Sequence, residues 1–207
     1  MDTELENKKN LMFFLKAYYK LIVGLALTLI IIGLFYMWFD HKENLNKTKI
    51  SDKFIQAKIL LTDNNKVESK DILENIINQK NKIYSPLSLF LIIDQDLVSD
   101  NKIIIDYFNI ILSIKGIENE DLNLLKLKKA IFISDFADEK EILDLLNPII
   151  NSESVWRIQC LKFLGDKYYF MKEYNKAEQY YSKLLDEKNT NIDINEIKRK
   201  MKLIKNG

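Results

Sequence analysis

Leu164 to Tyr181, LGDKYYFMKEYNKAEQYY, is the stretch that decides the fold. It predicts two helices joined by a turn at residues 170–173. Gly165 has no side chain, so the two helices can approach each other closely at that point. Ala177 is small for the same reason and is expected to receive a tyrosine ring, while Tyr181 is expected to fill the gap to the next helix. The stretch therefore predicts a closely packed helical hairpin.

The spacing of small and aromatic residues in this hairpin is similar to the tetratricopeptide pattern. That pattern has Leu-Gly, then Tyr three residues later, then Ala and an aromatic residue four apart in the second helix. The matching residues are Leu164, Gly165, Tyr168, Tyr174, Ala177 and Tyr181. Either Tyr168 or Tyr174 is expected to supply the ring that packs on Ala177. The chain departs from the pattern at Leu161 and Asn189, where the family has an aromatic residue and a proline.

The rest of the chain predicts further helices, because apolar residues recur at helical spacing between short polar breaks. Five Gly and two Pro in 207 residues are too few for the turns of a sheet-rich fold. The expected helices include 87–98, 102–113, 122–133 and 139–150, with Ser69 and Ser85 as caps of the second and third helices. The glycine does not recur 34 residues earlier, where Ile131 stands, so the repeat is degenerate upstream. We predict an all-α fold: a tetratricopeptide-type solenoid of about four helix pairs with a C-terminal capping helix.

A membrane anchor is predicted near the N-terminus. Leu21 to Phe39, LIVGLALTLIIIGLFYMWF, has 19 residues and no charge. At about 1.5 Å per residue it is long enough to cross the hydrocarbon core of a bilayer, and aromatic residues stand at both ends. Bulky residues at 36–39 replace the small ones that a signal peptidase needs, so we expect an uncleaved helix. The predicted parts are a tail at 1–20, a transmembrane helix at 21–39, a linker at 40–49 and a helical solenoid at 50–205.

The order of these features resembles the bacterial YfgM family, the ancillary subunit of the SecYEG translocon. The resemblance covers residues 10–190 and includes the Ser85-Pro86 step into a helix and the segment 154–157 before the hairpin. It implies a single-pass inner-membrane protein with a cytoplasmic N-terminus and a periplasmic domain, although lysines on both sides of the apolar run leave the orientation open. It also implies a role in holding periplasmic chaperones near the translocon. The family's groove positions, carried onto this hairpin, imply a partner-binding face made of Gln159, Lys162, Asp166 and Tyr169.

Composition argues against other classes of function. Four of the 31 basic and three of the 30 acidic side chains precede residue 40, so the remainder is formally neutral and lacks the basic footprint of a nucleic-acid binder. His41 and Cys160 are the single histidine and cysteine, so neither a catalytic triad nor a zinc site is expected. Asp94, Asp96 and Asp100 lack the glycine and glutamate of a calcium loop. We expect no enzyme activity, cofactor, metal or small-molecule substrate.

Two functions stay open at this point. The first is an interaction scaffold, tethered by residues 21–39, that presents a groove to other proteins. The alternative is a self-associating envelope or cell-division assembly factor. The C-terminal helix also allows two interpretations, since its basic side chains could contact anionic lipid or an acidic partner, or could form a solvated outer face. Its basic residues are Lys198, Arg199, Lys200, Lys202 and Lys205, and its inner stripe is Ile194, Ile197, Met201 and Ile204.

Overall fold

A computed structural model describes residues 28–29, 31–35, 48–187 and 192–206. The chain divides into two compact units, residues 1–53 and 54–207. Every regular element in the described ranges is an α-helix, and none of these residues forms a strand. The prediction of an all-α fold is therefore confirmed.

The first unit contains the predicted membrane span. The span 21–39 lies mostly outside the described residues, and its described residues, 28–29 and 31–35, are helical. Their large apolar side chains are exposed by 59% to 65%. Within the part of the chain that the structure describes, no helix combines the length and apolar character needed to cross a bilayer.

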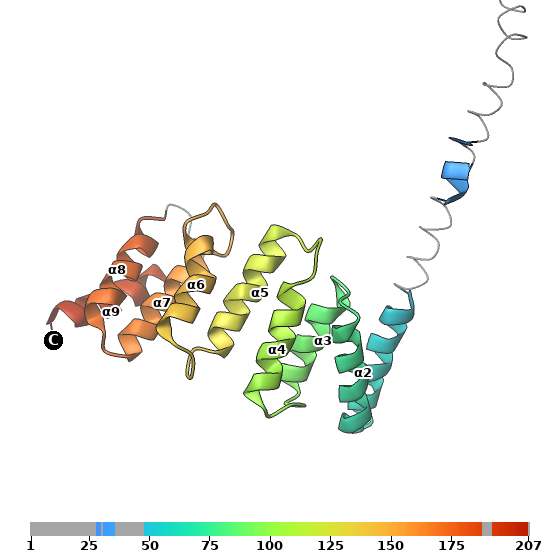
Figure 1. Cartoon of the computed structure of the whole chain (residues 1–207). Helices are drawn as coiled ribbons and strands as arrows, with labels where there is room; N and C mark the ends of the chain where they lie inside the picture. Colours follow the sequence, from blue (N-terminus) through green and yellow to red (C-terminus); the bar gives the residue numbers. More distant parts are fainter. Residues whose placement is uncertain (1–27, 30, 36–47, 188–191, 207) are drawn as a thin grey trace, which may run out of the picture. The chain divides into compact units, whose positions relative to one another are not determined.

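The second unit is a row of helices in which each element packs on the next along the chain (Figure 1). The helix that begins at residue 48 ends at residue 62, and its part in this unit, residues 54–62, is called the 54–62 segment below. The other elements are α2 (Lys66–Asn78), α3 (Tyr84–Asp94), α4 (Asn101–Leu112), α5 (Asn119–Phe132), α6 (Glu139–Ile150), α7 (Arg157–Phe170), α8 (Tyr174–Leu185) and α9 (Ile194–Asn206). The turns after residue 62, α3, α5 and α7 lie along the lower edge in Figure 1, so the helices alternate in direction.

Two hydrophobic cores stabilise this row, and they meet at α5. The upstream core runs from Ala57 to Leu125 and includes the fully buried aromatic Phe108. The downstream core runs from Leu127 to Ile197, and Phe132 packs against both. Burial of this apolar surface is the main force that holds the helices together, since short isolated helices are marginal in water.

Two helix starts differ from the sequence prediction. Asn65, not Ser69, caps α2 by accepting a hydrogen bond from the Glu68 backbone N–H. The Asn81 side chain, not that of Ser85, accepts the first backbone N–H groups at the start of α3. Both serines instead lie buried inside their helices, where Ser69 donates to the carbonyl of Ala57 and Ser85 to that of Ile76, each over 2.9 Å. These serines are small enough to lie where two helices come close, and each hydroxyl is satisfied by a hydrogen bond to a backbone carbonyl of the preceding helix.

The α7–α8 hairpin has the close approach that the sequence predicts at Gly165. A Cβ atom at this position would lie 2.5 Å from Cε1 of Tyr181, which no side chain could tolerate without a shift of the ring. The ring of Tyr181 therefore covers Gly165 of the preceding helix, and it is buried in the same core as Ile197 of the next helix, α9. Tyr168 is buried in the same core as Ala177, and its ring stacks on Tyr180 with centroids 5.5 Å apart.

Candidate protein-binding groove

The face predicted on α7 is assembled, but α9 partly covers it through the side chain of Lys200. Asp166 lies at its centre, where its carboxylate accepts hydrogen bonds from Lys162 on α7 and from Tyr181 on α8. Lys200 of α9 donates to the same carboxylate over 2.7 Å, and its ammonium lies 5.8 Å from the ring centroid of Tyr169. Three of the four predicted contact residues thus already interact within the chain. Gln159, the fourth, remains exposed on α7.

Electrostatics reinforce this arrangement. Burial alone would raise the pKa of Asp166, but hydrogen bonds from Lys162, Lys200 and Tyr181 outweigh burial and hold the pKa below its ordinary value. Burial alone would lower the pKa of Lys200, and its hydrogen bonds to Asp166 and Glu196 raise it instead. Both groups therefore stay charged at neutral pH. A partner that used this face would have to displace α9 and break these ion pairs.

An open apolar groove lies in the upstream half, where the sequence analysis placed no site. Its volume is 730 Å³. The 54–62 segment, α3 and α5 form its walls, and α4 contributes Phe108. These walls are the first helices of three successive pairs. The apolar lining residues are Phe54, Leu87, Phe90, Leu91, Ile93, Phe108, Ile131 and Phe132, and the charged ones are Lys58, Asp94 and Lys128.

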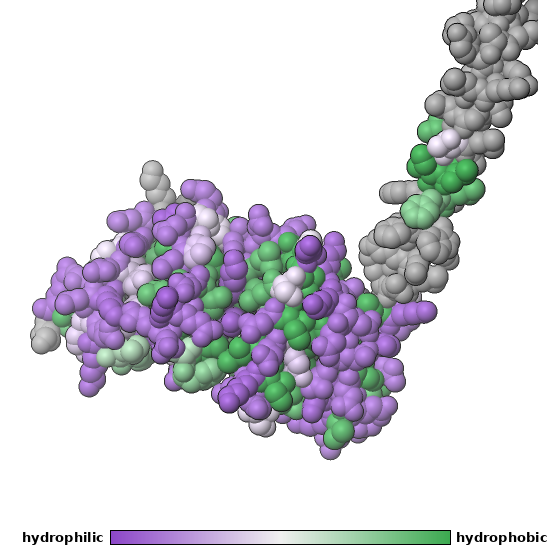
Figure 2. Space-filling model, in the orientation of Figure 1, coloured by the Kyte–Doolittle hydropathy of each residue, from purple (hydrophilic) through white to green (hydrophobic). Residues whose placement is uncertain are grey.

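The groove combines a fixed floor with accessible walls. Phe108 is 1% exposed, and its ring lies 5.9 Å from that of Phe132, so the aromatic floor is held by the core. Leu87 and Ile131 are each 43% exposed, which leaves much of their apolar surface in contact with water. Figure 2 views the row from the side of α2 and α4; hydrophobic side chains also reach this surface over α4 and α5, whereas the end formed by α7 to α9 is mainly hydrophilic. Contiguous exposed apolar surface of this kind marks interaction sites.

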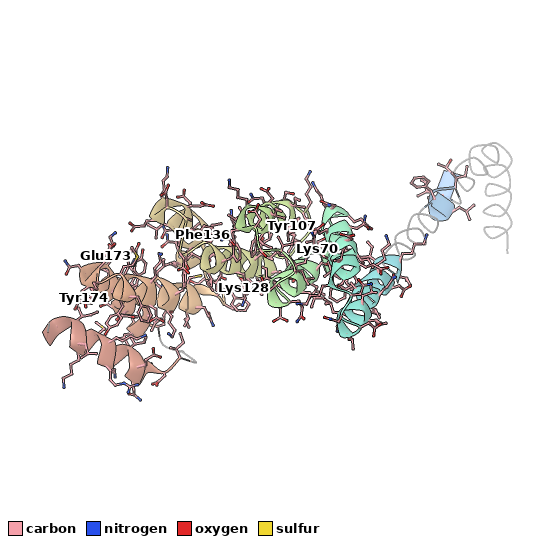
Figure 3. The ribbon with its side chains drawn as sticks, turned by 90° about the horizontal axis from the view of Figure 1, so that it is seen from below. Lys70, Tyr107, Lys128, Phe136, Glu173 and Tyr174 are labelled. Carbon is pink, nitrogen blue, oxygen red and sulfur yellow. The ribbon has the colours of Figure 1, made fainter. Side chains whose placement is uncertain are left out.

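The charged side chains of the groove, unlike Lys200 and Asp166, are not paired with one another. Lys58 and Lys128 are exposed, and neither forms an ion pair within the described part of the chain. Asp94 accepts a hydrogen bond from the side chain of its neighbour Gln95. Figure 3 labels Lys128 on the opposite side of the row from Lys70 and Tyr107, which belong to the second helices of their pairs. Two unpaired lysines therefore lie among the apolar side chains of the groove.

Burial and local hydrogen bonds explain the shifted pKa values of Cys160 and Tyr107 in the second unit. Burial raises the pKa of the Cys160 thiol to about 12, and this residue is fully buried, as expected for a core position. Burial and a hydrogen bond to Glu74 raise the pKa of Tyr107. Among the described residues, no three His, Cys, Asp or Glu side chains are grouped so as to hold a metal ion. The groove thus offers apolar surface with charged side chains among it.

Comparison of the chain with protein-family models, with curated proteins and with solved structures found no match. The resemblance to the YfgM family is therefore a proposal, and so is everything that it implies about partners and location.

One signal in the sequence could have found the groove. The α3 sequence, YSPLSLFLIID, is apolar on nearly every face, although a helix at the surface of a small domain needs only one apolar stripe. Leu89 and Ile92 fill the core, and the remaining apolar side chains of α3, Leu87 and Phe90 among them, line the groove.

Proposed function

We propose that this chain is a membrane-anchored scaffold that binds other proteins through the groove between the 54–62 segment, α3 and α5. The observation that carries the proposal is a 730 Å³ apolar groove with exposed Leu87 and Ile131 and unpaired lysines. Exposure of this apolar surface to water is unfavourable, and covering it with a partner recovers about 25 cal/mol for each Å² removed from water. A groove with a fixed aromatic floor and polar groups beside it has the composition of a protein interface.

The anchor is proposed on the apolar run 21–39. The described part of this run is helical. Its large apolar side chains are exposed, Phe35 by 65% and Ile31 by 64%. A helix that faces lipid needs such a surface. Tethering raises the effective concentration of the domain at the membrane, so that modest affinity in the groove suffices for function.

The proposed partners follow from the resemblance to the YfgM family. They are translocon components and periplasmic chaperones, with the domain on the periplasmic side of the inner membrane. The tetratricopeptide character of the domain is part of the same proposal. It is supported by the four helix pairs and the last helix found within residues 48–187 and 192–206, and by the approach of Tyr181 to Gly165 in the best-matched pair.

A binding function without chemistry is also part of the proposal. It is supported by the burial of the single thiol. His41, the single histidine, lies outside the described residues.

Photo-crosslinking in intact membranes tests the proposal. A photoreactive amino acid replaces Leu87 or Ile131 in the full-length chain, and Ile103 serves as the matched control because it is 39% exposed on α4 outside the groove. We expect adducts with translocon or chaperone proteins at the two groove positions and few at residue 103. Equal labelling at all three positions would contradict the proposal. Adducts with a second copy of the chain alone would favour the alternative, a self-associating assembly factor.

A further inference from the structure

We propose that the groove binds an amphipathic α-helix whose polar flanks are acidic. This inference rests on the proposed function and specifies the class of partner that the same site takes. Three observations carry it: the helical walls of the groove, the sign of its unpaired charges, and the way in which the chain seats its own amphipathic helix α9.

The walls of the groove favour a helical ligand over an extended one. The 54–62 segment, α3 and α5 are helices whose backbone N–H and C=O groups bond within the helix, so they offer no free edge to an extended peptide. An extended peptide pressed into this apolar groove would bury its own backbone polar groups without partners, which is costly. A helix satisfies those groups internally and presents apolar side chains at positions i, i+3, i+4 and i+7.

The unpaired charges favour an acidic ligand. Lys58 and Lys128 come from two different walls, the 54–62 segment and α5, and neither forms an ion pair in the described part of the chain. Asp94 on α3 is the one acidic lining residue, so positive charge exceeds negative by two to one. Carboxylates beside the apolar stripe of the ligand would pair with both lysines and so set its orientation.

α9 shows how this architecture seats an amphipathic helix. Its apolar stripe buries Ile197 completely and packs Met201 on the downstream core. Its charged flank places Lys200 on Asp166, over 2.7 Å. The groove repeats this combination of an apolar surface with charge beside it, but the sign of the charge is reversed. The basic α9 of a second copy therefore does not match the groove, which argues for a different chain as the occupant.

A binding experiment with designed peptides tests the proposal. The full-length chain, reconstituted in phospholipid nanodiscs, is titrated with two labelled peptides of about 18 residues, a length at which an isolated helix becomes stable. Both carry the same leucine stripe, with glutamates on the polar flanks of one and lysines on those of the other. Fluorescence anisotropy reports binding. We expect the glutamate peptide to bind about tenfold more tightly than the lysine peptide.

Matched variants locate this binding. The double variant Lys58→Glu/Lys128→Glu should reverse the preference, whereas Lys102→Glu/Lys140→Glu, at exposed lysines outside the groove, should leave it unchanged. Leu87→Asp with Ile131→Asp should abolish binding of both peptides, and Ile103→Asp should not. A proline in the middle of the glutamate peptide breaks the helix and should weaken binding about tenfold. Circular dichroism shows that each variant is folded before its binding is interpreted.

Several outcomes would overturn the proposal. They are equal or tighter binding of the lysine peptide, a preference that survives Lys58→Glu/Lys128→Glu, and unchanged affinity for the proline peptide. If photo-crosslinking identifies partners at residues 87 and 131 but the glutamate peptide does not bind, the proposed ligand class is wrong and the scaffold function stands. If both experiments fail, the groove is not a binding site and both proposals fall.

Discussion

The upstream and downstream halves of the helical domain differ in how far the faces of the first helices of their pairs are covered by other parts of the chain. In the downstream half, α9 covers α7 and α8, and the polar face around Asp166 is paired within the chain. In the upstream half, apolar side chains of the 54–62 segment, α3 and α5 stay open to solvent beside Lys58 and Lys128. We expect the paired face around Asp166 to contribute to stability, and the open face is the one that we propose for binding. Substitutions should therefore have opposite consequences in the two halves.

The largest expected effect is at Gly165. Its replacement by Val would place a Cβ atom 2.5 Å from the Tyr181 ring, and this ring is fully buried. We expect Gly165→Val to lower the free energy of unfolding by about 3 kcal/mol, because overpacking forces the ring and the helix to shift. Urea unfolding followed by circular dichroism measures this change. Gly33→Val is the matched control, since a Cβ atom there meets nothing within 4 Å; an equal loss in both variants would contradict the packing argument.

A smaller effect is expected at Asp166. Asp166→Asn keeps the shape of the side chain but removes the charge that Lys162, Lys200 and Tyr181 share. We expect a loss of about 1.5–2 kcal/mol, at the low end of the range for a hydrogen bond to a charged group, together with faster hydrogen exchange in α9 than in α3. The exposed Asp144 provides the control Asp144→Asn. Unchanged exchange in α9 would show that this carboxylate does not hold the helix.

The same carboxylate makes the difference between wild type and Asp166→Asn depend on pH. The folded-state pKa of Asp166 lies below its ordinary value, so its stabilising contribution is complete above that value and disappears as the pH falls through the folded pKa. The pKa of Lys200 is raised, so its contribution is lost only at alkaline pH, as the pH rises through its folded pKa. The difference in unfolding free energy should stay constant around neutral pH and vanish once the pH has fallen below the folded pKa of Asp166. A difference that persisted in acid would point to packing instead of charge.

The smallest effect on stability is expected in the open groove. Leu87 is 43% exposed, so Leu87→Ser should change the free energy of unfolding by no more than about 0.5 kcal/mol. The same substitution should weaken binding of the glutamate peptide, because the leucine contributes contact area to the ligand. Ser substitution of fully buried Leu89, two residues further along α3 and on its other face, is the comparison and should be strongly destabilising. Equal stability losses at both positions would mean that the groove is part of the core.

The helical fold was predictable because apolar spacing and the shortage of Gly and Pro depend on local sequence alone. The helix Glu139–Ile150 agrees with the prediction at both ends, and Gly165 marks the close helix contact as expected. The caps were harder. Ser69 and Ser85 have the composition of caps, but tertiary contacts with preceding helices bury them, and asparagines four residues earlier in each case are the actual hydrogen-bond acceptors.

The candidate site was harder still, since it depends on which helices cover one another. Lys162, Asp166 and Tyr169 share a helix face, as the sequence predicts, but local spacing could not show that Lys200 of α9 would reach that face. The walls of the groove come from three helices, and their lining residues are separated along the sequence by as much as the distance from Phe54 to Phe132. The apolar excess in α3 was the one local sign of it.

The position of α5 limits where the helical domain can be truncated without loss of the groove. Leu125 belongs to the upstream core and Leu127 to the downstream one, and the buried Lys129 joins Asn109 of α4 to Glu141 of α6 over 3.1 and 3.2 Å. A truncated chain that stopped before α5 would lose one wall of the groove, and one that stopped directly after it would leave Leu127 and Lys129 uncovered. The shortest fragment able to retain the groove therefore has to extend through α6 and accept the cost of a newly exposed surface there.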